Sequence, residues 1–366
     1  MTQLRGMTWD HPRGIDPLLA LSRVWHAQHG VEVTWEKRSL QDFESYPVED
    51  LARRFDLIVM DHPHVGQVTG EGCLLPLPEA PEIAEGSVGG SFESYTWQGH
   101  QWAWPIDAAA QVQAVRPDLT GPLTGWDDVM ALAREGRVAI PLRPPHGLMS
   151  FFTLTANLGH PCRTGRGEAF CDRDGAGEAL SMLKALADVV DPACFELDPI
   201  AVLDRMTDGD DIACAPLIYG YISYAIPGMR PKRVTFHDIP STGSGGTGSA
   251  LGGTGIAVSA FSGAPEAAVA FARHIAGPEA QAGLYVEAGG QAGHRAGWTS
   301  PAADAAAGGF YSGTLATLDG AWMRPRHDGY MPFQQLAAER VNQALKDGRI
   351  EAALDDLDAM FVKSFG

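Results

Sequence analysis

The sequence lacks the usual signs of a disulfide scaffold, a membrane span or a nucleotide site. Its five cysteines are scattered and include no CxxC pair, which excludes a dense disulfide framework and a cysteine zinc knuckle. One bridge, such as Cys162 to Cys171, remains open. No apolar run approaches the ~20 residues of a membrane helix. No stretch matches GxGxxG, Walker A, GxSxG or a kinase signature.

Positive charge is also scarce. The chain carries 27 Lys and Arg against 45 Asp and Glu, a formal net charge of −18. Proteins that bind nucleic acids need a basic face, so we expect no nucleic-acid partner. The N-terminus has no basic start followed by an apolar run, so the sequence as it stands predicts a cytoplasmic protein. The alternative is a periplasmic protein whose leader was removed.

The chain is long enough for two domains. The 366 residues are 45% hydrophobic and 20% charged, and single cores usually stop growing before ~300 residues. Apolar patterning predicts strands at 3–8, 31–36 and 55–60. Helices are expected at 42–54 and from about Asp16, with Pro17 in the first turn. This βαβαβ opening predicts a parallel sheet, which binds ligands beyond the carboxyl ends of its strands.

Later segments continue the α/β pattern. Two extended segments, broken at Pro105 and Asp107, suit a strand that passes from one lobe to another. The glycine-rich segment 241–255 suits a tight loop where the chain returns. Further elements are predicted from apolar periodicity: strands at 138–141, 212–216 and 256–258, helices at 126–135, 149–158, 177–190, 200–207 and 265–276, and two final helices within 333–365 that meet at 347–348.

Several short motifs occur in an order typical of one family. They are an aromatic-Pro-x-Asp followed by a strand (102–117), TGWDD (124–128), ACAP followed by an aromatic loop (213–219), GGTGIAV (252–258), a helix ending in Pro-Glu (264–279) and GGQ (289–291). Together they make the chain resemble the sugar-type extracellular solute-binding proteins of ABC importers.

This resemblance implies an α/β protein of the type II periplasmic-binding fold, in which two doubly wound lobes joined by a hinge close on a ligand. The N-terminal lobe would comprise 1–107 with 255–300, and the C-terminal lobe 108–254 with 301–366. It also implies a monomer, an ABC permease as partner and no cofactor.

Two loops at strand ends carry the first candidate ligand contacts. The first supplies Trp9, Asp10, His11 and Arg13, and the second supplies Asp61, His62 and His64. Both should face the cleft from the same lobe. Arg13, just before a helix, suits a ligand anion, and the imidazoles suit hydroxyl binding or proton transfer. A role of the histidines in capping a turn is the alternative.

The remaining candidates are scattered along the chain. Tyr219 and Tyr221 offer flat apolar faces to a sugar, with core packing as the alternative. Asp107 suits a hydroxyl or cation, or a hinge cap. His146 follows a predicted strand. Gly252 and Gly253 would let a ligand approach the backbone, with a role in a turn as the alternative. Arg295 and Arg324 are positive charges in an acidic chain, and surface ion pairs are the alternative for both.

Three functions follow from these residues. The leading one is a solute-binding protein that closes around a carbohydrate, polyol or sugar acid for ABC import. The second is a cytoplasmic lyase or isomerase that uses the His11, His62 and His64 cluster. The third is a cytoplasmic ligand sensor. The same histidines with Asp10 or Asp61 form an acceptable zinc set, but Pro63 restricts how the rings turn, and we predict no metal.

Overall fold

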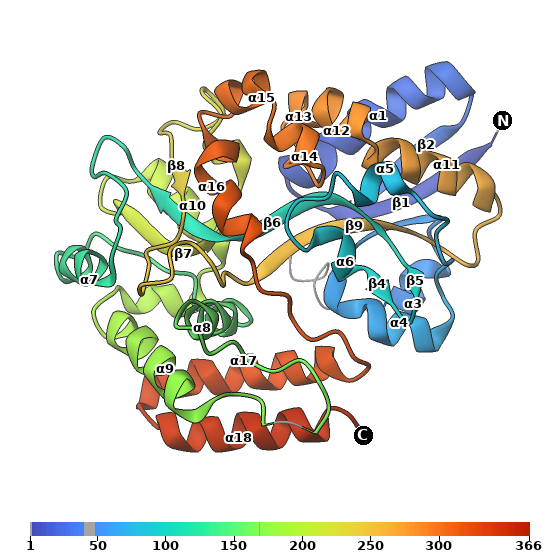
Figure 1. The fold of residues 1–366 in the computed structure, drawn as a ribbon. Coiled ribbons are helices and arrows are strands. Elements are labelled where there is room, and N and C mark those ends of the chain that lie inside the picture. Colours follow the sequence, from blue (N-terminus) through green and yellow to red (C-terminus); the bar gives the residue numbers. More distant parts are fainter. Residues whose placement is uncertain (1, 40–47, 168) are drawn as a thin grey trace. The chain divides into compact units, whose positions relative to one another are not determined.

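The computed structural model describes residues 2–39, 48–167 and 169–366, and the chain divides into two compact units (Figure 1). Unit 1 comprises Met1–Ala108, Gly252–Ala305 and Arg326–Asp328, and unit 2 comprises Ala109–Leu251, Ala306–Pro325 and Gly329–Gly366. Segments 252–254, 301–305 and 326–328 therefore lie in unit 1, whereas the sequence analysis placed them in the second lobe.

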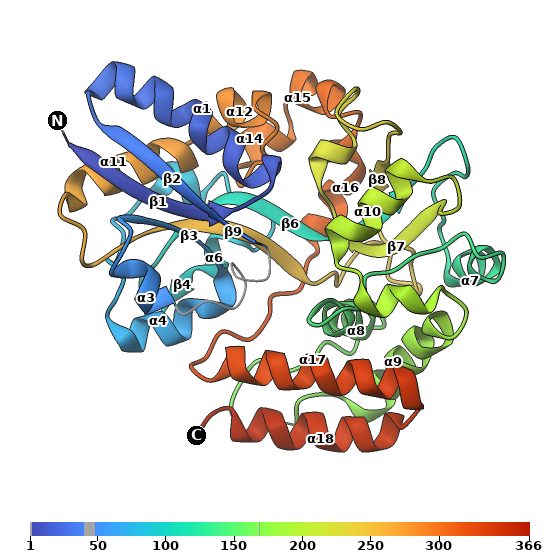
Figure 2. The same ribbon diagram turned by 180° about the vertical axis from the view of Figure 1, so that it is seen from behind.

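Unit 1 contains a sheet in the order β2-β1-β3-β9. Strand β1 (Gln3–Trp9) pairs in parallel with β2 (Glu32–Arg38) and β3 (Leu57–Asp61), and β9 (Leu251–Val258) runs antiparallel to β3. Helices α1 (Pro12–His29) and α11 (Pro265–Ala276) lie on one side of this sheet, and α3 (Val48–Ala52) and α4 (Val65–Glu71) on the other (Figure 2). Because both faces are covered, β3 is a continuous apolar run without polar alternation.

Short elements complete unit 1. They are the 3₁₀ helix η1 (His62–His64), α5 (Pro81–Ala84), α6 (Ser91–Ser94), the hairpin of β4 (Thr96–Trp97) and β5 (His100–Gln101), α12 (Pro278–Ala282), α13 (Leu284–Glu287), α14 (Arg295–Trp298) and the start of α15 (Pro301–Ala306).

Unit 2 is built on the second half of β6 (Trp104–Val115), which pairs antiparallel with β7 (Cys214–Tyr219) and β8 (Thr235–His237). A helical layer is formed by α8 (His146–Asn157), α9 (Arg173–Ala187), α17 (Tyr330–Asp347) and α18 (Ile350–Lys363), and α16 (Phe310–Asp319) packs against β8. The unit also contains α7 (Trp126–Arg134), α10 (Pro199–Asp208), η2 (Pro192–Glu196) and η3 (Ile222–Tyr224).

The observed start of α1 differs from the sequence prediction. The helix begins at Pro12 rather than near Asp16, so Arg13 and Gly14 are helical and Pro17 lies inside the helix. The cause is local: His11 is the N-cap, and its Nδ1 accepts a hydrogen bond from the backbone N–H of Arg13 at 3.2 Å. Pro12 then occupies the first turn, where a missing N–H costs nothing.

Three other predictions were wrong in detail. The predicted break at Pro105 and Asp107 is absent, because β6 is one continuous strand. Residues 138–141 form no strand, only an isolated parallel bridge from Val138 to Cys214. Gly252 and Gly253 lie within β9 and not in a loop before it. Part of the helix predicted at 42–54 falls on residues outside the described ones, and the described part is α3.

The long helices agree with the sequence. Helix α11 has the predicted bounds, α7 differs by one residue, and the final helices α17 and α18 flank Gly348 with the left-handed backbone expected of a helix C-cap. None of the helices in the described residues is both long and apolar enough to span a bilayer.

Candidate functional site

The candidate residues of unit 1 gather at one edge of its sheet. Strands β1 and β3 are parallel neighbours, with Met7 opposite Ile58, so their carboxyl ends lie side by side. Trp9 is the last residue of β1 and His11 follows that strand, while His62 and His64 follow β3 in η1. All four side chains are buried, with at most 5% of their surface exposed.

A buried ion pair joins the first turn of α1 to β6. Arg13, in the first turn of α1, donates from Nε to Asp107 Oδ2 at 2.7 Å and from its terminal nitrogen to Asp107 Oδ1. The two side chains are 5% and 0% exposed. Burial raises the pKa of the Asp107 carboxyl, and the Arg13 guanidinium opposes this rise through its charge and hydrogen bonds. The two opposite charges therefore neutralise each other inside unit 1.

Aromatic packing fixes the surroundings of the edge. The Trp9 ring covers Gly14, where an added Cβ would lie 2.4 Å from the indole. The His62 ring meets Tyr95 edge-on, with centroids 6.3 Å apart. Tyr95 donates to the Met60 carbonyl at 2.9 Å, which ties β3 to this ring. The sequence analysis missed Tyr95, which lies far from both loops in sequence.

Thr254 is a second residue that the sequence analysis missed. It lies in β9 directly opposite Asp61 of β3 and is 5% exposed. Within the described part of the chain, its Oγ1 has no hydrogen-bond partner. A buried hydroxyl without a partner costs about 1–3 kcal/mol, which makes Thr254 a candidate site residue.

Other candidates of unit 1 are more exposed than this buried group. Asp10 is 55% exposed and pairs with Lys37 at 2.6 Å. Gly252 and Gly253 are half-buried in β9, where Gly253 has a positive φ of 93°. Arg295 begins α14 and is half-buried, and its backbone N–H donates to the Gly86 carbonyl.

Unit 2 holds a separate group of buried polar residues around His146, the first residue of α8. Arg324 is 5% exposed and donates to Gln334 Oε1 at 3.0 Å. Burial lowers the pKa of His146 to about 4, an effect that Asp198 opposes and the charges of Arg143 and Arg324 reinforce. His146 is therefore a neutral ring at physiological pH, and its Nδ1 is buried with no hydrogen-bond partner in the described residues.

Tyrosines complete the unit 2 group. Tyr219 ends β7 and is half-buried, and Tyr221 is 5% exposed and meets Tyr224 edge-on at 6.5 Å. Burial raises the pKa of Tyr330, while the positive charge of Arg324 opposes the rise. The sequence analysis missed Gln334 as a polar neighbour because it belongs to α17, which has the pattern of an ordinary amphipathic helix.

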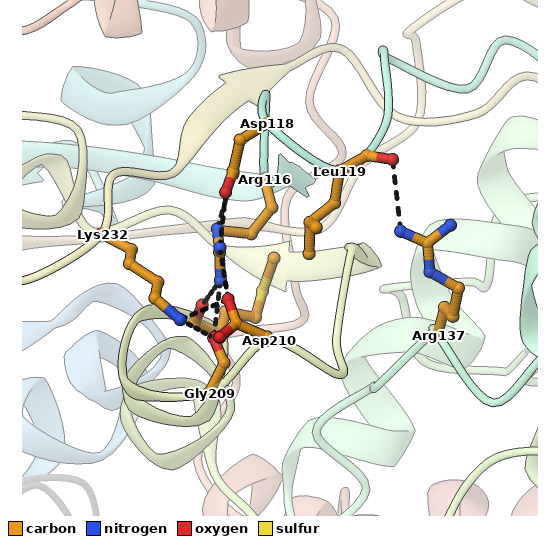
Figure 3. Close-up of polar contacts among 8 residues, drawn as sticks. Arg116, Asp118, Leu119, Arg137, Gly209, Asp210 and Lys232 are labelled. Carbon is orange, nitrogen blue, oxygen red and sulfur yellow. Dashed lines mark hydrogen bonds and ion pairs between the residues drawn. The ribbon is translucent and has the colours of Figure 1, made fainter.

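A cluster of charged side chains in unit 2 holds separate segments of the chain together (Figure 3). Arg116 is fully buried, donates to Asp118 Oδ1 at 2.8 Å and Asp210 Oδ1 at 3.3 Å, and caps the end of α10 through the Gly209 carbonyl at 2.8 Å. Lys232 donates to the same carbonyl at 2.9 Å. These groups are mutually satisfied, which makes the cluster a tie between segments and not a ligand site.

Metal binding finds no support in the geometry. Across residues 2–39, 48–167 and 169–366, no group of three or more His, Cys, Asp or Glu side chains is arranged to hold a metal ion.

Comparison with solved structures defines the class of protein. The maltose-bound MalE3 of T. maritima matches with a TM-score of 0.85 and 16% identity over 99% of both chains. A solute-binding protein of an ABC transporter from Thermotoga lettingae, bound to α-D-tagatose, matches with a TM-score of 0.84 and 14% identity over 100% of both. One from Agrobacterium radiobacter, in complex with ribitol, has a TM-score of 0.77 and 19% identity over 99% of this chain and 98% of that one. The fold is thus the two-lobed α/β fold of periplasmic binding proteins.

The family model for bacterial extracellular solute-binding proteins matches residues 25–307, and the chain belongs to this family. The resemblance inferred from the motif order is confirmed. Comparison with curated protein sequences gives no significant match. The family consists of binding proteins and is described as extracellular, which does not support the cytoplasmic prediction.

Proposed function

We propose that this protein binds a small carbohydrate or polyol reversibly and delivers it unchanged to the permease of an ABC importer outside the cytoplasm. The family match over residues 25–307 is the observation that carries the proposal. Solved structures of the same fold support it, since their bound ligands are maltose, tagatose and ribitol. We further propose that the protein acts as a monomer.

Buried polar atoms in each unit support a hydroxyl-rich ligand. Sugars need flat apolar surfaces and a few well-placed donors and acceptors. Thr254 Oγ1 in unit 1 and His146 Nδ1 in unit 2 are buried without hydrogen-bond partners in the described residues. We propose a contact set in each unit, taken separately. The unit 1 contact set is Trp9, His11, Asp61, His62, His64 and Thr254, and the unit 2 contact set is His146, Tyr219, Tyr221 and Arg324.

The other candidates have roles that the contacts explain without a ligand. Arg13 and Asp107 neutralise each other in a buried ion pair. We propose that this pair fixes the start of α1 and thereby holds the unit 1 contact set in place. Asp10, Gly252, Gly253 and Arg295 lie outside the proposed set. Asp10 is exposed and pairs with Lys37, the two glycines carry no side chain, and Arg295 begins α14, where its backbone N–H donates to the Gly86 carbonyl.

The same contacts favour binding over catalysis. A general acid or base needs a pKa near the working pH, whereas burial holds the pKa of His146 at about 4. His11 Nδ1 is already the acceptor for the Arg13 backbone N–H, so the ring acts as a helix cap. We therefore propose that the protein is not an enzyme.

A thermal-shift screen of the purified protein against sugars, polyols, sugar acids and amino acids tests the proposal, because a ligand of the native state raises the melting temperature by mass action. We expect the hits to be sugars or polyols, each recovered unchanged by NMR. Hits confined to amino acids would refute the ligand class. Consumption of a hit by wild type but not by His62→Ala would make the protein an enzyme.

A matched pair of histidine variants tests the contact set. His62→Ala removes a buried ring beside Tyr95, and we expect its ligand-induced shift to vanish. His160→Ala removes an exposed histidine that pairs with Asp172 in unit 2, and its shift should equal that of wild type. Equal shifts in both variants would remove His62 from the set.

A further inference from the structure

Two of the five cysteines meet in unit 2. Cys162 lies in the loop after α8 and is buried, and Cys171 lies just before the N-cap of α9 and is half-buried. Their sulfur atoms are 3.5 Å apart and the residues are nine positions apart in sequence. A disulfide bond has an S–S length of about 2.05 Å, so the sulfurs need to approach by roughly 1.5 Å, which side-chain rotation readily supplies.

The backbone already holds the two cysteines in register. The Arg163 N–H donates to the Phe170 carbonyl at 2.7 Å, so the residues next to the two cysteines are joined. The Cys162 sulfur also contacts Thr155 Oγ1 of α8 at 3.6 Å. The backbone bond between Arg163 and Phe170 is independent of the thiols, so a bond between the sulfurs adds to an existing arrangement.

The loop between the cysteines anchors the C-terminal helix. The Phe170 backbone N–H donates to Asp358 Oδ1 of α18 at 2.8 Å, and the Phe170 ring lies 4.7 Å from that of Phe361. The Arg166 guanidinium donates to the carbonyl of Gly366 at 3.1 Å. A covalent link across this loop would therefore stabilise the packing of α18 against α9.

We infer that Cys162 and Cys171 form a disulfide bond when the protein is exposed to an oxidising environment. The inference goes beyond solute binding, and only the expected presence of an oxidant rests on the extracellular description of the family. The contact between their sulfur atoms distinguishes this pair from the other cysteines. Cys73, Cys194 and Cys214 are all fully buried.

The oxidation is a balanced exchange with a small disulfide such as oxidised glutathione. The thiolate of half-buried Cys171 attacks one glutathione sulfur, forms a mixed disulfide and releases one glutathione thiolate. The Cys162 thiolate then attacks the Cys171 sulfur and releases the second. The two cysteine protons pass to the two departing thiolates. Burial and the contact with Cys162 raise the pKa of Cys171, so the exchange should be faster in alkaline buffer.

The test is peptide mapping of the folded protein after incubation with oxidised glutathione at about pH 8.5, where thiolate forms more readily. Free thiols are then blocked, and trypsin digestion follows without reductant. We expect fragment 138–163 to be linked to fragment 167–173, with the loss of two hydrogens, and the link to disappear after reduction. Cys73→Ala, a substitution in unit 1, should retain the link, and Cys171→Ser should lose it.

Thermal unfolding provides a second readout. Closing a loop lowers the entropy of the unfolded chain, so we expect the oxidised protein to melt a few degrees higher than the reduced protein, with no such difference in Cys171→Ser. Two free thiols at Cys162 and Cys171 after oxidation, or a link from either cysteine to a different one, would overturn the inference. Because neither readout uses a ligand, its failure leaves the proposed binding function untouched.

Discussion

Arg13 and Asp107 form a two-point ion pair inside unit 1, in which Arg13 Nε lies 2.7 Å from Asp107 Oδ2. One residue lies at the start of α1 and the other in β6, and neither side chain is more than 5% exposed. The pair thus ties the first helix of unit 1 to a strand that continues into unit 2.

We predict that Asp107→Asn lowers the free energy of unfolding by about 3–5 kcal/mol, because it leaves the buried Arg13 guanidinium without its counter-charge. The double variant Arg13→Met/Asp107→Leu removes both charges, and we expect it to recover most of this loss. Chemical denaturation with urea measures both. A double variant less stable than Asp107→Asn would show that packing, and not charge, determines the effect.

The second prediction concerns glycine-to-alanine substitutions at two helical sites, Gly14 and Gly70. We expect them to change the stability of the protein in opposite directions. Glycine to alanine in an unobstructed helix stabilises by about 0.5–1 kcal/mol. At Gly14 the new Cβ would lie 2.4 Å from the Trp9 ring, and we expect a loss of about 1–3 kcal/mol from overpacking. At Gly70 of α4 nothing lies within 4 Å of the new Cβ, so Gly70→Ala should stabilise slightly. Melting temperatures that rise in both variants would contradict the packing of Trp9 on α1.

The pH dependence of stability follows from His146. Its pKa is lowered to about 4 in the folded protein against about 6.5 in the unfolded chain, so the unfolded state binds more protons between these values. Stability attributable to this residue is therefore complete above pH 6.5 and is lost as the pH falls towards 4, by up to about 3 kcal/mol.

We predict that His146→Asn flattens the fall in stability between about pH 6.5 and pH 4, as measured by urea denaturation across the range. His160→Asn is the control, since His160 is exposed, and its profile should follow that of wild type. A His146→Asn profile as steep as that of wild type would mean that another group is responsible.

The sequence predicted the helices and the family better than the details of the site. Period and composition predicted α7, α11 and the final helix pair, because each has one apolar face and clear ends. The start of α1 was missed because Pro17 is as suitable for a first turn as Pro12. What decided between them was the hydrogen bond that His11 accepts from the Arg13 backbone, a local contact without a sequence signal.

The candidate site shows the same limit. Strand order predicted that the loops after β1 and β3 lie at one edge of a sheet, and the side chains of His11, His62 and His64 are buried there. Neither the pairing of Arg13 with Asp107 nor the position of Thr254 opposite Asp61 could be inferred. Both depend on contacts between residues that are far apart in sequence, and only the folded backbone sets these contacts.

The most direct test of the account is a calorimetric titration of the protein with the sugar or polyol that gives the largest thermal shift. We predict saturable binding of one ligand per chain with a dissociation constant in the micromolar range or tighter, and full recovery of the unchanged ligand after denaturation of the protein. Absence of heat with every sugar and polyol, or recovery of a chemically altered ligand, would contradict the claim that this is a carbohydrate-binding protein.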